Sequence, residues 1–515
     1  MQKRTGRIQA AFYGFCSRTI AALLLLFMCY LLPMSFFRTT GMSTGTGKGE
    51  VISFNYDNFF LNLILLFISV CLIYLLWRHF ESISLNRLLS VLCVWVLAFG
   101  LVFVLNTKLQ PSEDSYIVNF FARQAARGDF SYYHEYFKFY PFQLGYVLYA
   151  EAFFRLFNLV LPGAPEGFGS LALQGLNVIY TAFAYCALVK FSGYVFKSET
   201  VQKLSALLMF FCMPPLFFAT FMYGNVPALA FICAGLWLYA AFLEKGRWYN
   251  GLGAALALTV AVILKLNSLI VVLAVLIAVF VSFVKKPRWS LALFAAVFAL
   301  VLLLVMPLPQ KLYEARMGEK LGDGIPQVSW LAMGLHEGSS CSGWYSPTYT
   351  TTAYRLTEYD PDATAFISEK AIQERLDAFR QYPIECYRFF GRKFLSQWNE
   401  PTYQGLWNNQ LRDHYSQPGF VYRLLCHDWE RPVKAFMNIY QQLIFFGFAL
   451  GLVRIFRRRD MSASLLPLII LGAMLYHLLF EAKSQHSQGY FIMMIPVAAF
   501  GFARWFEYLR DNKPR

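Results

Sequence analysis

The stretch LGAALALTVAVILKLNSLIVVLAVLIAVFVSFV, residues 252–284, decides the fold of this chain. It contains one charged side chain, Lys265, in an otherwise apolar run. A helix needs about 20 apolar residues to cross a bilayer, so the run is too long for one ordinary span. We expect a hairpin of two helices, 252–266 and 268–284, with Lys265 at its turn. The alternative is one long tilted helix with Lys265 buried, and a charge at membrane depth is by default a functional-site hypothesis.

The rest of the chain has the same apolar character. Of the 515 residues, 57% are hydrophobic and only 15% are charged, whereas soluble domains carry roughly 25% charged residues. Further apolar runs predict additional spans near residues 19–37, 58–77, 86–105, 171–196, 202–222, 226–243, 289–307, 436–456, 463–480 and 489–508. A segment at 142–160 adds one more candidate, but Glu151 and Arg155 interrupt it at a spacing that lets them pair on one helix face. The sequence therefore predicts an all-α multi-pass membrane protein with twelve or thirteen transmembrane helices.

The distribution of charge predicts which loops face the cytoplasm. The net charge is +15, but the basic residues cluster in short segments beside apolar runs, as in Lys285–Lys286 and Arg457–Arg459. Such clusters mark cytoplasmic loops, and no basic stripe typical of nucleic-acid binding is present. We expect both termini in the cytoplasm and the loops 106–141 and 308–435 on the external face. Three of the ten cysteines fall in the second loop, where they could form at most one disulfide.

This topology divides the chain into five parts. The long polar loop is large enough for a small external domain and mixes helical with turn-rich stretches. The expected order is N-terminal transmembrane helices (1–105), an external loop with an interfacial helix (106–141), transmembrane helices (142–307), the external, mostly helical domain (308–435), and C-terminal transmembrane helices with a cytoplasmic tail (436–515).

Two adjacent carboxylates stand where the first external loop leaves the membrane. Glu113 and Asp114 precede a helical pattern over 116–127, whose apolar side would lie along the membrane surface. Asp114 at the head of this helix would serve as its N-cap. The functional interpretation is a general base at the mouth of a membrane cavity. The two roles are compatible, because a cap would hold the carboxylate in a fixed direction.

Several short stretches carry a resemblance to a known group of enzymes. They are GDFSYY and YPFQLG in the first loop, IPQVSWLAMGL and GWY within 325–345, KFLSQWNEPTYQGLW at 393–407, and EAKSQHSQGYFIMMIP at 481–496. Together with the acidic loop they resemble bacterial GT-C glycosyltransferases that use polyprenyl-phosphate sugars, in particular the family 39 protein-mannosyltransferase and aminoarabinose-transferase group. The resemblance extends from about residue 86 to residue 508.

The resemblance implies a GT-C-like fold and a role for each motif. Asp114 would be the catalytic carboxylate that deprotonates an acceptor hydroxyl or amine. Family members often have Asp-Glu at this point, whereas this chain has Glu113-Asp114 followed by Ser115, so Glu113 competes for the role. External-side cations could meet the donor phosphate, although lysines near helix ends commonly reach toward lipid headgroups: Lys138, Lys265, Lys483, Arg392 and Lys393. Other side chains could contact the sugar or the acceptor: Tyr140, Gln143, Trp344, Tyr345, Trp398 and Tyr490. Of these, Trp344, Tyr345 and Trp398 could instead lie in an interfacial aromatic belt.

The implied function is that of a hexosyltransferase-type glycosyltransferase that acts by direct displacement with inversion. It would move a sugar from a polyprenyl-phosphate donor to an external cell-wall polymer, lipid-linked glycan or protein. The alternatives are a lipid or glycan transporter or flippase, and a glycan ligase or polymerase. No nucleotide-binding loop and no metal-ligand spacing occurs in the sequence, so we expect no cofactor, and nothing in it supports a divalent metal.

Overall fold

The computed structural model describes residues 2–44, 49–131, 135–410 and 419–511. Within these residues, 9 helices are long and apolar enough to cross a membrane, or up to 10 if a bent pair forms one span. The long helices are α1 (Gln2–Phe37), α2 (Phe59–Phe80), α3 (Leu85–Thr107), α7 (Glu166–Phe196), α10 (Asn225–Lys245), α12 (Leu269–Lys285), α13 (Trp289–Val305), α21 (Glu430–Arg458) and α23 (Ser484–Asp511). The chain is a multi-pass helical membrane protein, which confirms the class expected from the sequence.

The run 252–284 forms two helices. α11 (Trp248–Leu264) ends before Lys265, and a short 3-10 turn, η3 (Leu266–Ser268), leads into α12. The expected break is confirmed, and the alternative of one continuous helix is wrong. α11 and α22 (Leu465–Leu479) are apolar but shorter than an ordinary span.

The expected span at 202–222 is broken. α8 (Glu199–Phe210) is followed by α9 (Pro214–Phe217) and η2 (Phe218–Thr220), and the two parts differ in direction by 48°. The break follows from Pro214 and Pro215, which lack the N–H groups that would continue the α8 ladder. If this bent pair and the short helices α11 and α22 also cross the membrane, the described residues contain twelve spans. Twelve is the lower of the two numbers expected from the sequence.

Two helices near the C-terminal end pack with their backbones close together. α21 lies along α23, and three glycines stand at the contact. A Cβ added at Gly501 would lie 2.2 Å from the carbonyl oxygen of Gly447, and one added at Gly451 would lie 2.2 Å from that of Val497. Small residues at helix interfaces allow such close approach inside membranes.

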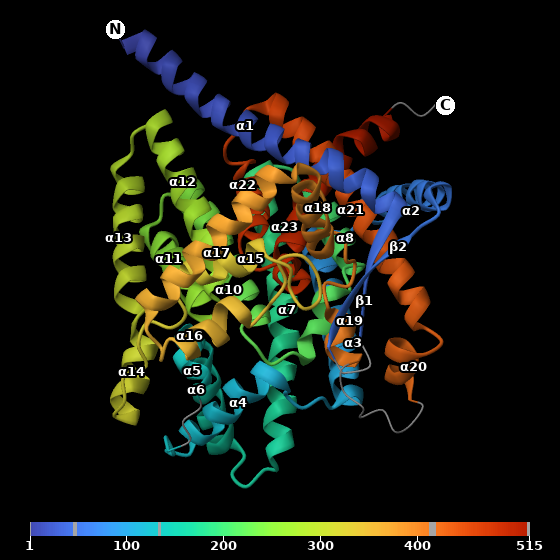
Figure 1. Ribbon diagram of the computed structural model, residues 1–515. Helices are drawn as coiled ribbons and strands as arrows, with labels where there is room; N and C mark the ends of the chain where they lie inside the picture. The colour runs from blue at the N-terminus through green and yellow to red at the C-terminus, as the bar shows by residue number, and fades with distance from the viewer. Residues whose placement is uncertain (1, 45–48, 132–134, 411–418, 512–515) are drawn as a thin grey trace.

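A β-hairpin follows the first helix, which the sequence analysis did not predict. β1 (Arg38–Thr44) and β2 (Glu50–Tyr56) pair antiparallel, with Gly41 opposite Ser53. The sequence signal was the alternation in VISFNY, whose exposed and half-buried positions alternate along most of the strand. Figure 1 shows the hairpin in blue beside the α19 and α21 region.

The segment after α3 forms helices at one end of the molecule. They are α4 (Glu113–Ala126), α5 (Tyr136–Phe139), η1 (Pro141–Gln143) and α6 (Leu144–Val160). The chain termini lie toward the opposite end of the view from α4 and α6 (Figure 1). In α6 the expected pair of Glu151 and Arg155 is present at 2.8 Å, and Arg316 also binds Glu151 at 3.0 Å. α6 is not among the helices long and apolar enough to cross a membrane within the described residues.

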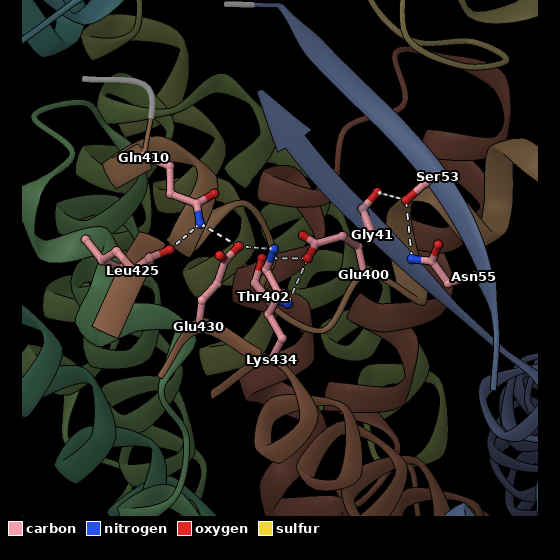
Figure 2. Close-up of polar contacts among 9 residues, drawn as sticks. All are labelled: Gly41, Ser53, Asn55, Glu400, Thr402, Gln410, Leu425, Glu430 and Lys434. Carbon is pink, nitrogen blue, oxygen red and sulfur yellow. Dashed lines mark hydrogen bonds and ion pairs between the residues drawn. The ribbon is translucent and has the colours of Figure 1, made fainter. Parts of the chain in front are cut away.

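The loop after α13 is mostly helical. Its helices are α14 (Leu308–Met317), α15 (Gln327–Leu335), α16 (Ala353–Leu356), α17 (Pro361–Gln381), α18 (Pro383–Trp398), α19 (Gly405–Gln410) and α20 (Phe420–Cys426), with a π-helical turn η4 (Thr348–Thr352). Gln410 of α19 donates to Glu430 of α21 at 3.0 Å, and Glu430 also pairs with Lys434 (Figure 2). Cys341, Cys386 and Cys426 are free thiols.

Candidate active cavity

The start of α4 is capped by serines. Ser112 is the N-cap, and the Ser115 hydroxyl accepts from the Ser112 N–H at 3.1 Å and donates to the Ser112 carbonyl at 2.7 Å. The expectation that Asp114 caps this helix is therefore wrong. Because the serines form the capping box, the Asp114 carboxylate is not needed at the helix end.

Buried contacts fix the orientation of α4. Its buried face consists of Ser115, Val118, Asn119, Phe121, Ala122 and Ala125, whereas Tyr116, the first residue of the expected helical pattern, is exposed. The Asn119 amide donates to the Met222 carbonyl at 2.8 Å and accepts from the Tyr146 hydroxyl at 3.2 Å. α4 thus packs against α6 and the turn after η2 rather than lying on the surface alone.

A cavity of about 520 Å³ lies at the N-terminal end of α4. Segments from across the chain form its walls: β2, α4, the α5–η1 turn, the α11–α12 link, the 327–345 region, and the segment between α22 and α23. Its charged lining residues in the described part of the chain are Glu50, Glu113, Asp114, Lys265, Glu481 and Lys483. A concave site with a few converging polar groups is the usual form of a small-molecule site.

Asp114 presents an available carboxylate to this cavity. Its side chain is exposed, and because Asp114 lines the cavity, the exposed surface faces the cavity interior. The protein atoms around this carboxylate reduce its hydration and so raise the pKa of Asp114, an effect that Lys483 and Lys265 oppose. A carboxylate with a raised pKa is a stronger base once it is ionised.

Two lysines, Lys265 and Lys483, also line the cavity. The Lys483 ammonium pairs with Glu50 at 2.6 Å, and the Lys265 nitrogen lies 4.9 Å from the centre of the Tyr223 ring. Burial acts to lower the pKa of Lys483, but the charges of Glu50 and Glu481 outweigh it and raise that pKa above its ordinary value. Lys483 is therefore held in its charged form.

Hydroxyl and amide groups complete the polar lining. The hydroxyls of Tyr140 and Tyr345 lie 3.4 Å apart. The Gln143 amide donates to the Tyr223 hydroxyl, which lies 3.3 Å from that of Tyr136. The cavity therefore combines carboxylates, ammonium groups and tyrosine hydroxyls, which together can bind a sugar and an anionic group.

The structure separates the candidates named from the sequence. Those that line the cavity are Glu113, Asp114, Tyr140, Gln143, Lys265, Tyr345 and Lys483. Tyr490 lines a smaller adjoining hollow and donates to the Asn267 carbonyl at 3.2 Å. Lys138, Trp344, Arg392, Lys393 and Trp398 are not among the lining residues of the cavity. Tyr132 and Tyr133 of the GDFSYY motif lie outside the described residues.

Some of these remaining candidates support the cavity wall. The buried Lys393 ammonium donates to the Gly334 carbonyl and, at 2.7 Å, to that of Phe480, which lines the cavity. Burial lowers the pKa of Lys393 to about 7. The indole N–H of Trp344 donates to Ser396 at 2.7 Å, and Trp398 is fully buried. Lys138 pairs with Glu319 at 3.3 Å.

Sequence reasoning missed several lining residues. Glu50 had no sequence signal, because it lies in the unpredicted hairpin. Glu481 and His486 stand within the quoted EAKSQHSQ stretch, yet neither was singled out. Within the described residues no group of three or more His, Cys, Asp or Glu side chains could hold a metal ion.

Fold and cavity together define a multi-pass helical membrane protein with a polar cavity beside its transmembrane helices. No protein-family model and no curated protein matches the chain. Two solved structures are similar to it: archaeal oligosaccharyltransferase AglB from Archaeoglobus fulgidus in complex with an inhibitory peptide and a dolichol-phosphate, and the Archaeoglobus fulgidus oligosaccharyltransferase in the apo form. Each is 13% identical, with a TM-score of 0.44 over 84% of this chain. The chain spans about half the length of these proteins, 51% in each case.

Proposed function

We propose that the protein is a membrane glycosyltransferase that uses a polyprenyl-phosphate-linked sugar as donor. The observation that carries the proposal is the convergence of the motif-bearing segments on one cavity. Segments that are remote in sequence line the cavity that Asp114 faces. Their lining residues are Tyr140 and Gln143, Trp330 and Tyr345, Trp407, and members of the Glu481–His486 segment. The motifs that carry the resemblance thus meet around Asp114, and the resemblance implies that Asp114 deprotonates the acceptor.

Asp114 acts as the general base in this proposal. Its carboxylate takes the proton from the acceptor hydroxyl or amine as that group attacks the anomeric carbon of the donor. The bond between this carbon and the phosphate oxygen breaks, and its electron pair leaves with the polyprenyl phosphate. Direct displacement inverts the anomeric centre. A positioned base contributes about 10²–10⁴-fold to such a rate.

Lys265 and Lys483 stabilise the leaving group. Negative charge grows on the phosphate as the bond breaks, and preorganised cations in a water-poor site favour that charge. The tyrosine hydroxyls around Tyr223 and Tyr140 hydrogen-bond the sugar. The acceptor is an external glycan, lipid or protein, and the reaction takes place on the external face of the membrane.

Replacement of Asp114 tests the proposal. In Asp114→Asn we expect transfer of sugar from a polyprenyl-phosphate donor to fall by about 10²-fold or more, because the amide cannot accept the proton. The assay is sugar transfer by purified full-length protein in liposomes, with donor binding measured separately. Glu113→Gln on the same helix turn is the matched control and should retain most of the transfer.

The opposite pattern would overturn the assignment of the base. Full transfer in Asp114→Asn together with loss in Glu113→Gln would make Glu113 the base. An unchanged surface-glycan mass profile in cells lacking the protein, with altered solute flux, would instead favour a transporter.

A further inference from the structure

Lys483 is held by a partner from a remote part of the chain. Its ammonium lies 2.6 Å from Glu50 Oε1, and both side chains are largely covered, with exposed fractions of 20% and 15%. Glu50 begins β2, near the N-terminus, whereas Lys483 lies in the link between α22 and α23. A close pair at this depth requires both partners to be held accurately.

Gln404 connects Glu50 to the segment that carries Lys483. Its amide nitrogen donates to Glu50 Oε1 at 3.1 Å, and its amide oxygen accepts from the backbone N–H of Gln485 at 3.3 Å. Tyr403 and Gln404 both adopt left-handed backbone conformations, with φ of 48° and 64°. Such a conformation is unfavourable for a residue with a side chain, so the surrounding contacts must enforce it.

Glu400 enforces the turn that carries Gln404. Its carboxylate accepts from the backbone N–H groups of Thr402 at 2.9 Å and Gln404 at 2.6 Å, and from the Ser484 hydroxyl at 3.1 Å. Figure 2 shows Glu400 and Thr402 in this turn, alongside the β1–β2 hairpin. The turn therefore links the start of α23 to the hairpin.

The hairpin packs on the end of α18, which leads directly into this turn. The Asn399 amide donates to the Arg38 carbonyl at 2.7 Å, and the Thr40 N–H donates to the Asn399 carbonyl at 3.1 Å. The Thr40 hydroxyl donates to the Leu395 carbonyl at 3.0 Å. These contacts fix the strand pair, and so the place of Glu50 relative to the cavity.

The surroundings of Lys483 explain why it needs a partner. The charged and titratable groups that face it are Glu50 from β2, Asp114 from α4, Lys265 from the α11–α12 link, Glu481 from its own segment and His486 from α23. Lys265 repels the ammonium, and the surrounding protein disfavours its charge. Among the groups that favour the charge, Glu50 has the largest effect.

We propose that Glu50 is a positioning residue, whose carboxylate holds the Lys483 ammonium in place and aligns it with the donor phosphate. The proposal rests on the proposed function. Glu50 takes one N–H of the ammonium and leaves the others to the phosphate. The hairpin thus contributes Glu50 to the cavity. All the other charged lining residues in the described part of the chain come after residue 112 in the sequence.

Binding of a short-chain polyprenyl phosphate to the purified full-length protein tests this inference. We expect Glu50→Gln to weaken binding by about tenfold, because the ammonium loses its charged partner. Glu50→Asp should recover part of the loss. The matched control is Asp57→Asn at the other end of β2, where Asp57 binds Thr39 and Asn438 outside the cavity, and this variant should bind as the natural protein does.

A double-mutant cycle separates positioning from a general structural effect. In a Lys483→Met background, Glu50→Gln should cause no further loss, since its effect acts through Lys483. In transfer assays Glu50→Gln should raise KM for the donor while kcat changes less than in Asp114→Asn.

Two results would overturn the inference. Unchanged binding in Glu50→Gln would show that Lys483 needs no partner, and tighter binding would show that Glu50 competes with the phosphate. Failure of the natural protein to bind polyprenyl phosphate is a different result, which would count against the proposed function itself.

Discussion

Asp114 is available for chemistry because neighbouring residues carry out the structural task at the helix start. Ser112 and Ser115 form the capping box, so the carboxylate between them in sequence turns to the cavity. Glu113 adopts a left-handed conformation with φ of 48° at the same point. Strain of this kind is common where side chains are aimed at a functional site. Both carboxylates line the cavity, so the paired variants Asp114→Asn and Glu113→Gln decide which of them is the base of the proposed reaction.

The electrostatics of Asp114 predict a pH dependence. In the proposed reaction Asp114 acts as an ionised carboxylate, so activity should be lost as pH falls through the pKa of Asp114, which reduced hydration raises and Lys483 lowers. In Lys483→Met the lowering contribution is gone, so this pKa rises further. We expect the acid limb of kcat, measured at saturating donor, to move to higher pH.

Lys370→Met provides the comparison for that measurement. Lys370 is an exposed lysine on α17, outside the cavity, and its replacement should leave the acid limb in place. An acid limb unchanged in Lys483→Met would mean that Asp114 is not the titrating base.

At the scale of elements, the contact between α21 and α23 predicts a packing defect. In Gly501→Ala the added Cβ meets the backbone oxygen of Gly447 at 2.2 Å, which no side-chain rotation can relieve. We expect the helices to separate and the variant to lose about 1–3 kcal/mol of stability. Thermal unfolding in detergent measures this, with Gly175→Ala as control.

Gly175 suits that purpose because it is also a helical glycine in a membrane span. A Cβ there would meet only Leu101, at 3.9 Å, which is an ordinary contact. Equal melting temperatures for the two variants would show that the α21–α23 contact does not depend on the missing Cβ atoms.

At the scale of the whole molecule, sidedness is the prediction to test. The loop containing α17 should be external and the end of α21 cytoplasmic, because basic residues at helix ends remain in the cytoplasm. We expect Glu369→Cys, an exposed position on α17, to react with a membrane-impermeant maleimide in intact cells. Arg458→Cys, also exposed, should react only after permeabilisation. The reverse pattern would invert the topology and place the cavity on the cytoplasmic face.

Apolar periodicity and length were enough to predict the helical membrane class and the break at Lys265. These features depend on local sequence, since a helix satisfies its own backbone and each span must match the bilayer. The bend after Phe210 was missed although Pro214 and Pro215 mark it. The β1–β2 hairpin was missed because a short pair of strands gains its stability from what it packs against.

The sequence by itself determined the class of protein and the break in the 252–284 run, and its motifs proposed Asp114 as a candidate base. Only the tertiary structure decided which cations reach that carboxylate. The sequence offers five cations as equal candidates. Lys265 and Lys483 line the cavity, whereas Lys138, Arg392 and Lys393 do not. The physical reason is that the effect of one charge on another depends on the distance between them and on their burial. Contacts such as that between Glu50 and Lys483 arise only when the folded helices bring remote segments together.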